Sequence, residues 1–311
     1  MMKRFYVLCL IPMLSLTIQA QLSTQAGKTY FNFLKLNPFP IDAALGKMAV
    51  AVDNDPIPLT SNPSHLAGLE KPMVVTGYYH LVEGINQGLI SYAVPWQKRF
   101  PVAFTAQYLS YGTIEGRDEN GLYTGDLSAS DFALSTTVGY LAKPNLKIGA
   151  SLCLAYSNLD GSSAAGLSLS FGALYRTHDK GSFGLSLLHV GTPIKKFYSS
   201  DPAEYPVTIA LGWSKSLEHL PVTPSLTLSQ SNGSDPYLHS GLIIRFIPAF
   251  SGRVGYYASL KEKISFSNDE TNHHGFTFGF NLNYQKIQMA LAVIPFGKLG
   301  TTQQLSLAYR F

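Results

Sequence analysis

The chain has 311 residues, of which 46% are hydrophobic but only 14% charged. Ordinary soluble domains carry about 25% charged residues, so this chain has few charges with which to cover a water-facing surface. Beyond the first twenty residues no apolar run approaches the roughly 18 to 20 residues of a membrane-spanning helix, so a helical membrane protein is not indicated. The net charge of +4 is small and its Lys and Arg residues are scattered, so a nucleic-acid-binding protein is not indicated either.

Residues 1–20, MMKRFYVLCLIPMLSLTIQA, have the pattern of a secretory signal peptide. Two basic residues precede a mostly apolar stretch from Phe5 to Leu16, and Ala20 marks the expected cleavage site. One of the two cysteines would leave with this peptide, so Cys153 would remain alone and no intramolecular disulfide could form. The sequence therefore predicts an exported protein that is stabilised without a disulfide.

Residues 21–70 do not alternate like strands. They contain a small-residue stretch from Ala43 to Val52, several prolines and a number of polar turn residues. The segment is too short for a core of its own and too apolar for a simple linker. Because a lumen of about fourteen strands is too wide for its own side chains to fill, we expect this segment to lie inside a barrel as a hatch.

The remaining residues, 71–311, alternate between apolar and small or polar side chains with a period of two. The alternation is plainest in SDFALSTTVGYLA at 130–142, LKIGASLCLAYS at 146–157 and GFTFGFNLNY at 275–284. These runs are about ten residues or longer, which matches the 9 to 11 residues of a tilted strand that crosses a bilayer. We expect about fourteen strands, near 73–80, 87–94, 101–111, 130–142, 146–157, 164–176, 182–191, 206–216, 222–230, 237–247, 250–259, 274–285, 287–294 and 303–311.

The face opposite the apolar one decides the class of β protein. In a soluble β-sandwich, which is the alternative, that face meets water and carries many Lys and Glu residues. Here it carries Ser, Thr, Gly, Ala and Asn, which suits the filled or wet interior of a barrel. The sequence therefore predicts an all-β fold, a transmembrane antiparallel β-barrel of about fourteen strands with the hatch in its lumen.

The connections between the expected strands alternate in length. Odd-numbered connections include long stretches at 112–129, 192–205 and 261–273, whereas even-numbered ones are as short as KPN at 143–145 and QK at 285–286. Outer-membrane barrels have long extracellular loops and short periplasmic turns. We therefore expect an outer-membrane location, with the long loops at the cell surface.

The last residues, LSLAYRF, alternate and finish on the aromatic Phe311. This pattern resembles the assembly signal of outer-membrane barrels. Because only a closed barrel leaves no open edge in lipid, we expect this strand to pair back to the first one.

Residues 29–66, TYFNFLKLNPFPIDAALGKMAVAVDNDPIPLTSNPSHL, resemble the N-terminal motif of the PorV/PorQ group of barrels, which are relatives of the FadL fatty-acid transporter fold. That motif runs from an aromatic start through AALGG and a DDP turn to NPALL. Three further stretches, 108–135, 147–159 and 211–228, resemble the PorQ branch in particular. The chain departs from the motif where Lys47 replaces the second Gly of AALGG and where Ser64 and His65 replace AL in NPALL.

The resemblance implies a non-enzymatic component of the type IX secretion system of the Bacteroidota. PorQ-like barrels in that system hold a surface partner, PorZ, within the attachment complex that links secreted cargo to anionic lipopolysaccharide. Partner contacts would then lie in the long loop after the third strand, where the candidates are Glu115, Arg117, Asp118, Glu119 and Tyr123. The alternative function is a FadL-like uptake channel for hydrophobic molecules, which predicts a continuous apolar pocket between hatch and wall, near Leu45, Met48, Val50 and Val52.

No sequence pattern indicates a catalytic, cofactor or metal site. A Gly-x-Ser-x-Gly elbow, a Walker loop and a His-Glu-x-x-His helix are all absent, and GWSKS at 212–216 lacks the second Gly of the elbow. An outer-membrane phospholipase would need a Ser-His arrangement that we cannot locate.

Two sets of charged residues remain open to more than one interpretation. The acids Glu115, Asp118, Glu119 and Asp126 could bind a cation, but a polar extracellular turn bent by glycines explains them without one. Arg245 and Arg253 are expected to face the lumen and to pair with hatch acids such as Asp42 or Asp53.

Overall fold

A computed structural model of the protein describes residues 29–53, 59–96, 99–198, 204–260, 275–296 and 300–311. The predicted signal peptide and the predicted long loop at 261–273 lie outside the described residues. Within the described residues, no helix is long and apolar enough to span a membrane.

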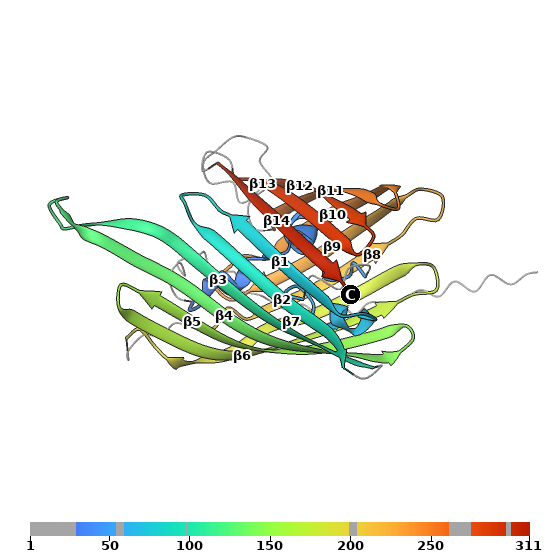
Figure 1. Ribbon diagram of the computed structural model, residues 1–311, viewed down its shortest axis with the longest axis horizontal. Coiled ribbons are helices and arrows are strands. Elements are labelled where there is room, and N and C mark those ends of the chain that lie inside the picture. Colours follow the sequence, from blue (N-terminus) through green and yellow to red (C-terminus); the bar gives the residue numbers. More distant parts are fainter. Residues whose placement is uncertain (1–28, 54–58, 97–98, 199–203, 261–274, 297–299) are drawn as a thin grey trace, which may run out of the picture.

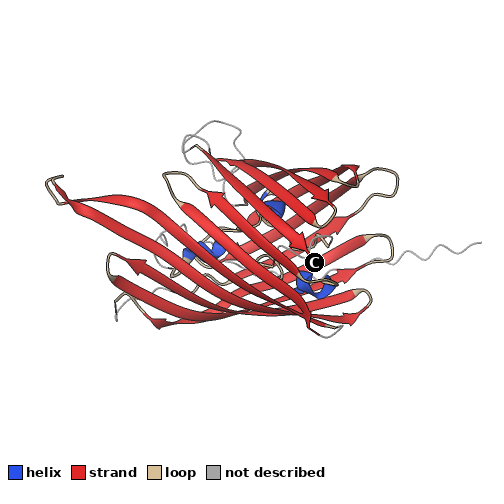
Figure 2. Cartoon of the chain, in the orientation of Figure 1, coloured by secondary structure: helices blue, strands red, loops and turns tan. Residues whose placement is uncertain are grey.

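Fourteen antiparallel strands among the described residues close into one barrel in chain order (Figures 1 and 2). Their bounds are β1 Met73–His80, β2 Asn86–Trp96, β3 Phe100–Arg117, β4 Tyr123–Lys143, β5 Leu146–Leu159, β6 Ser162–Arg176, β7 Gly181–Lys195, β8 Thr208–Lys215, β9 Val222–Ser231, β10 Tyr237–Ile247, β11 Phe250–Ser259, β12 Gly275–Tyr284, β13 Ile287–Pro295 and β14 Thr301–Arg310. Strand β1 pairs with β14 from Met73 opposite Arg310 to His80 opposite Gln303. The predicted barrel and the pairing of its last strand with its first are thus confirmed.

The two faces of the wall differ as the alternation predicts. On β5, Leu152, Leu154 and Tyr156 point outward and are 45%, 45% and 43% exposed, whereas Cys153 and Ala155 point inward and are 5% and 0% exposed. An outward apolar face is stable in lipid, where each backbone group must also find a partner within the sheet. Closure of the barrel provides these backbone partners, because it leaves no strand at an open edge.

Strands β3 and β4 are longer than predicted, and the predicted loop at 112–129 is wrong. Both strands continue past the wall as a two-stranded hairpin, in which Thr113 pairs with Ser128 and Ile114 with Leu127, and only Asp118 to Leu122 form the turn. Figure 1 shows this hairpin projecting beyond the neighbouring strands. The glycines of this stretch indicated a loop, but its Thr, Ile and Tyr residues favour extended backbone, and two strands can pair with each other beyond the wall.

The described residues include three short helices, which lie inside the ring of strands (Figure 2). They are η1 Asn32–Lys35, α1 Pro40–Ala43 and η2 Pro63–Gly68. Helix η2 packs against β3 to β6, and α1 packs against β12 to β14. The hatch side chains Phe39, Ile41, Leu45 and Leu66 are at most 1% exposed, so apolar side chains of the hatch fill the lumen that the wall leaves.

Candidate functional site: the hatch and the wall

The backbone of the hatch packs directly against inward-facing glycines of the wall. A Cβ atom added to Gly255 would lie 2.0 Å from the Gly46 amide nitrogen, and one added to Gly149 would lie 2.4 Å from the Pro63 carbonyl carbon. A third, on Gly184, would lie 2.4 Å from the Val50 carbonyl oxygen. Glycine inside a strand often marks a position where another backbone approaches closely. Here the hatch supplies that backbone.

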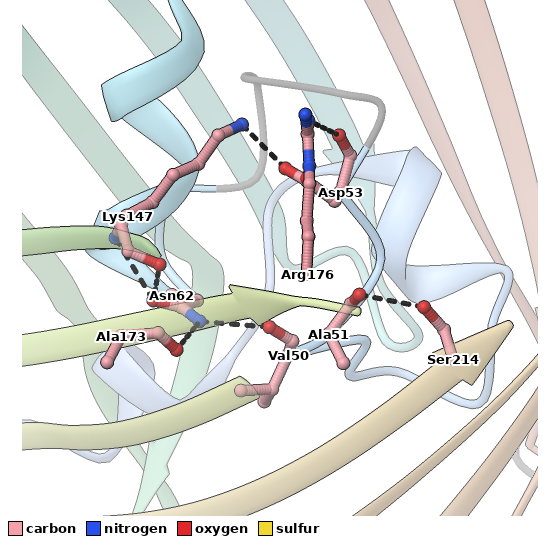
Figure 3. A network of polar contacts seen from close by, with 9 residues as sticks. Val50, Ala51, Asp53, Asn62, Lys147, Ala173, Arg176 and Ser214 are labelled. Carbon is pink, nitrogen blue, oxygen red and sulfur yellow. Dashed lines mark hydrogen bonds and ion pairs between the residues drawn. The ribbon is translucent and has the colours of Figure 1, made fainter. Parts of the chain in front are cut away.

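A buried carboxylate connects the hatch to two wall cations (Figure 3). Asp53 Oδ1 lies 2.6 Å from Lys147 Nζ of β5, and Asp53 Oδ2 accepts from Arg176 Nε at the end of β6. The side chains of Asp53, Lys147 and Arg176 are 7%, 9% and 45% exposed. Because two of these charges are withdrawn from water, each stabilises the other, and removal of either would leave a buried charge unpaired.

Neutral hydrogen bonds hold the backbone on both sides of Asp53. Asn62 Nδ2 donates to the carbonyls of Val50, at 2.9 Å, and of Ala173 on β6, at 3.2 Å. Its Oδ1 accepts from the Ser64 amide and so caps η2. Ser214 Oγ of β8 donates to the Ala51 carbonyl at 2.8 Å (Figure 3). Ser214 is the first serine of GWSKS, at the position of the nucleophile in a Gly-x-Ser-x-Gly elbow, and its hydroxyl instead binds the hatch backbone.

One of the two predicted luminal arginines contacts the hatch and the other contacts the wall. Arg253 is 4% exposed and its Nη1 donates to the Ile41 carbonyl of the hatch at 3.2 Å. Arg245 Nη1 donates to Thr223 Oγ1 of β9 at 2.7 Å. Both arginines therefore face the lumen, as predicted. The ion pairs of Asp53 described above are made with Lys147 and Arg176. The sequence pattern did not predict a role for these two residues.

Lys47 occupies an unusual backbone position in the hatch. Its φ is +78°, in the left-handed region that favours glycine, and its Nζ lies 3.8 Å from the ring centroid of Tyr257 and 4.3 Å from that of Phe296. Burial lowers the pKa of Lys47 to about 8. The departure from the AALGG motif is therefore accommodated in the conformation expected of glycine, with aromatic rings as partners of the ammonium group.

Aromatic side chains fill the lumen beside an irregular part of the wall. Among the described residues, β7 pairs with β8 only as far as Leu188, and the following residue, His189, has a φ of +57°. Near it the hatch residues Tyr30 and Phe31 pack with Phe197 and Tyr205 of the following connection, at ring-centroid distances of 5.2 to 5.8 Å. Phe31 is itself left-handed, with φ +54°. Strained non-glycine residues of this kind cluster at functional positions.

Three of the four hatch residues expected to line an apolar pocket pack tightly instead, and the fourth, Met48, is partly buried. Leu45, Val50 and Val52 are 1%, 0% and 3% exposed, and Leu45 and Val52 pack with Ile243 of β10. A cavity of about 230 Å³ does lie beside Asp53, between the ends of β6 to β9. Most of the residues that line it have polar side chains, among them Asp53, Arg176, Lys180, Ser182, Ser216 and Thr223. This cavity therefore differs from the apolar pocket predicted for an uptake channel.

The candidate partner-contact residues come together on the projecting hairpin. Glu115 and Arg117 lie on β3 and form an ion pair at 2.7 Å, while Tyr123 begins β4 and donates to Asp126 at 2.7 Å. Asp118 Oδ1 accepts the amides of Asn120 and Leu122 and so shapes the turn. These acids serve separate contacts, and the described residues contain no group of three His, Cys, Asp or Glu side chains arranged to hold a metal ion.

Comparisons with solved structures place the whole assembly of barrel and hatch in a known fold. The toluene transporter TbuX of Ralstonia pickettii has a TM-score of 0.61 and 15% identity, covering 91% of this chain and 100% of its own. The toluene transporter TodX of Pseudomonas putida has a TM-score of 0.61 and 14% identity, covering 88% and 97%. A FadL homologue of Pseudomonas aeruginosa has a TM-score of 0.51 and 12% identity, covering 87% and 97%.

The chain has the FadL-like barrel fold. Barrels of this kind are outer-membrane proteins, which agrees with the predicted location. No protein-family model and no curated protein matches the sequence.

Proposed function

We propose that the protein is an outer-membrane channel for small hydrophobic molecules. The observation that carries this proposal is the similarity, over about nine-tenths of the chain, to barrels described as toluene transporters. On this proposal the end with the short connections faces the periplasm and the opposite end faces the cell surface.

The aromatic cluster of Tyr30, Phe31, Phe197 and Tyr205 supplies a place where such a molecule could enter. It lies near the end of β7 that follows Leu188, for which the described residues show no pairing with β8. It offers apolar ring faces to a substrate without charge. A hydrophobic molecule would pass by displacing these rings, whereas the tightly packed hatch residues around Leu45 keep the rest of the lumen closed.

Uptake of labelled toluene and of a labelled long-chain fatty acid tests this function. Cells that lack the protein should take up at least one of them more slowly, and Phe31→Ala should change the rate. Phe276→Ala is the matched control, because Phe276 is an outward-facing aromatic that is 52% exposed. Unchanged uptake in the deletion strain would exclude the channel.

The second candidate is an anchor for a PorZ-like surface protein in a type IX attachment complex. The sequence resemblance motivates it, and the projecting β3–β4 hairpin supports it, because the edges of that hairpin are open beyond the wall. Strand β3 pairs with β2 only up to Ser110, and β4 pairs with β5 only from Ala129. Such edges can bind an added strand of a partner.

A mild-detergent purification of the tagged protein from its native outer membrane separates the two candidates. Recovery of a large surface protein that is lost when the projecting hairpin, residues 111–128, is replaced by a short turn would favour the anchor. A barrel recovered alone with bound lipid or fatty acid would favour the channel. If deletion of the protein left surface display of cargo intact, the anchor would be excluded.

A further inference from the structure

The cavity beside Asp53 lies at the end of the barrel where the connections are short. The turns after β6 and β8 flank it, and the hatch residues Val52 and Asp53 close its inner side. It is therefore built from elements that the wall and the hatch already hold in place. Neither proposed function uses it.

Donors outnumber free acceptors around this cavity. Asp53 is the one carboxylate in its described lining, and that group is already bound by Lys147 and Arg176. Arg176 donates from Nε to the Asp53 carboxylate and from Nη2 to the Asp53 backbone carbonyl, which leaves further N–H groups of its planar fork. Within the part of the chain that the structure describes, the ion pair of Lys180 is a long contact of 3.8 Å with Glu218, and both side chains are 60% exposed.

Hydroxyl groups add neutral donors to these cations. Ser182 lines the cavity, is 7% exposed, and its Oγ has no hydrogen-bond partner among the described residues. Ser216 and Thr223 share a hydrogen bond of 3.0 Å, and Arg245 donates to Thr223 from the next strand. A hydroxyl group that lines a cavity and has no protein partner can donate a hydrogen bond to a ligand there.

The other charges nearby leave a positive surplus. Lys215 is paired with Asp179 at 2.7 Å. Among the described residues, the ion pairs around the cavity join four cations, Lys147, Arg176, Lys180 and Lys215, to three carboxylates, Asp53, Asp179 and Glu218. A small anion with several acceptor oxygens would meet both the surplus charge and the unused donors.

We propose that this cavity binds a phosphate group, held by the Arg176 fork, the Lys180 ammonium and the Ser182 hydroxyl. A planar guanidinium matches the spacing of phosphate oxygens, and an ammonium group and a hydroxyl complete the set. A cavity of about 230 Å³ has room for the group and a small substituent. The proposal is independent of both candidate functions, because it requires neither a hydrophobic substrate nor a surface partner.

The direct test is equilibrium binding of inorganic phosphate to the purified full-length barrel in detergent, with chloride at equal ionic strength as the reference. Lys180→Gln and Ser182→Ala should each weaken binding, Lys180→Gln by about tenfold, because one charge-assisted hydrogen bond is lost. Neither residue holds the hatch, so both variants should fold. Lys143→Gln is the matched control, since Lys143 is an exposed cation beside another short turn, and it should bind as tightly as the unmodified protein.

A second arm distinguishes a free phosphate compound from a lipid headgroup. The same variants are titrated with glycerol 3-phosphate and with phosphatidylglycerol in mixed micelles. Binding of either that is weakened by Lys180→Gln supports the phosphate site and names its source. Absence of saturable binding of all three probes, or equal weakening by Lys143→Gln, would overturn it.

Discussion

Lys147 on the barrel wall and Asp53 in the hatch lie 94 positions apart in the chain, yet their charged atoms are 2.6 Å apart and both side chains are nearly buried. Arg176 binds the second oxygen of the same carboxylate. The hatch is thus attached to the wall by charge at one end, in addition to the close backbone packing against glycines. The stability of the plugged lumen therefore depends on a few identifiable contacts.

Asp53→Asn should loosen the hatch. The substitution leaves Lys147 buried without a counter-charge, and removal of one partner of a buried pair typically costs about 3 to 5 kcal/mol. We expect a lower free energy of unfolding in detergent and faster proteolysis of the hatch. Asp179→Asn is the control, because the Asp179–Lys215 pair is more exposed. Equal stability of the two variants would show that the Asp53 pair does not hold the hatch.

Gly255→Ala should destabilise the barrel by overpacking. The added Cβ would lie 2.0 Å from the Gly46 nitrogen, and misfits of one methyl group in a packed interior cost about 1 to 3 kcal/mol. Gly88→Ala places the same methyl group where no atom lies within 4 Å, so it should be neutral. Chemical denaturation of the two variants side by side checks the prediction, and a destabilised Gly88→Ala would contradict it.

The titration of Lys47 should make stability depend on pH in the alkaline range. Burial lowers the pKa of Lys47 from 10.5 to about 8 in the folded protein. Between about pH 8 and 10.5 the unfolded chain therefore binds more protons at this residue than the folded one, and stability contributed by this group rises with pH. Thermal unfolding measured across this range should show the rise in the unmodified protein and a smaller one in Lys47→Met. Parallel pH profiles would refute the assignment.

A charge on the outward face should be costly only within the lipid-facing belt. Leu154 lies in the middle of β5 and is 45% exposed, whereas Leu122 lies at the tip of the projecting hairpin and is 65% exposed. Leu154→Arg should cost about 2 to 4 kcal/mol, the penalty for Arg at the bilayer midplane, and Leu122→Arg should cost little. Refolding into lipid vesicles measures both, and equal costs would place the hairpin in the membrane.

The strand pattern was largely predictable because it depends on local information. In β5, Leu152, Leu154 and Tyr156 alternate with small residues. Because the side-chain period of a strand is two, the sequence of each strand shows which of its side chains lie on the same face. The projecting hairpin at the ends of β3 and β4 was not predicted. Gly116 and Gly125 indicate a loop when it is not known that they pair with each other. Cross-strand pairing overrode that local preference.

By itself, the sequence determined the barrel, its fourteen strands, the outward apolar face and a segment too apolar to be a linker. Only the tertiary structure decided which wall residues meet that segment: Lys147 and Arg176 at Asp53, and Gly149, Gly184 and Gly255 under its backbone. The physical reason is that periodicity is a property of neighbouring residues, whereas an ion pair or a close backbone approach depends on where the closed wall brings distant residues together.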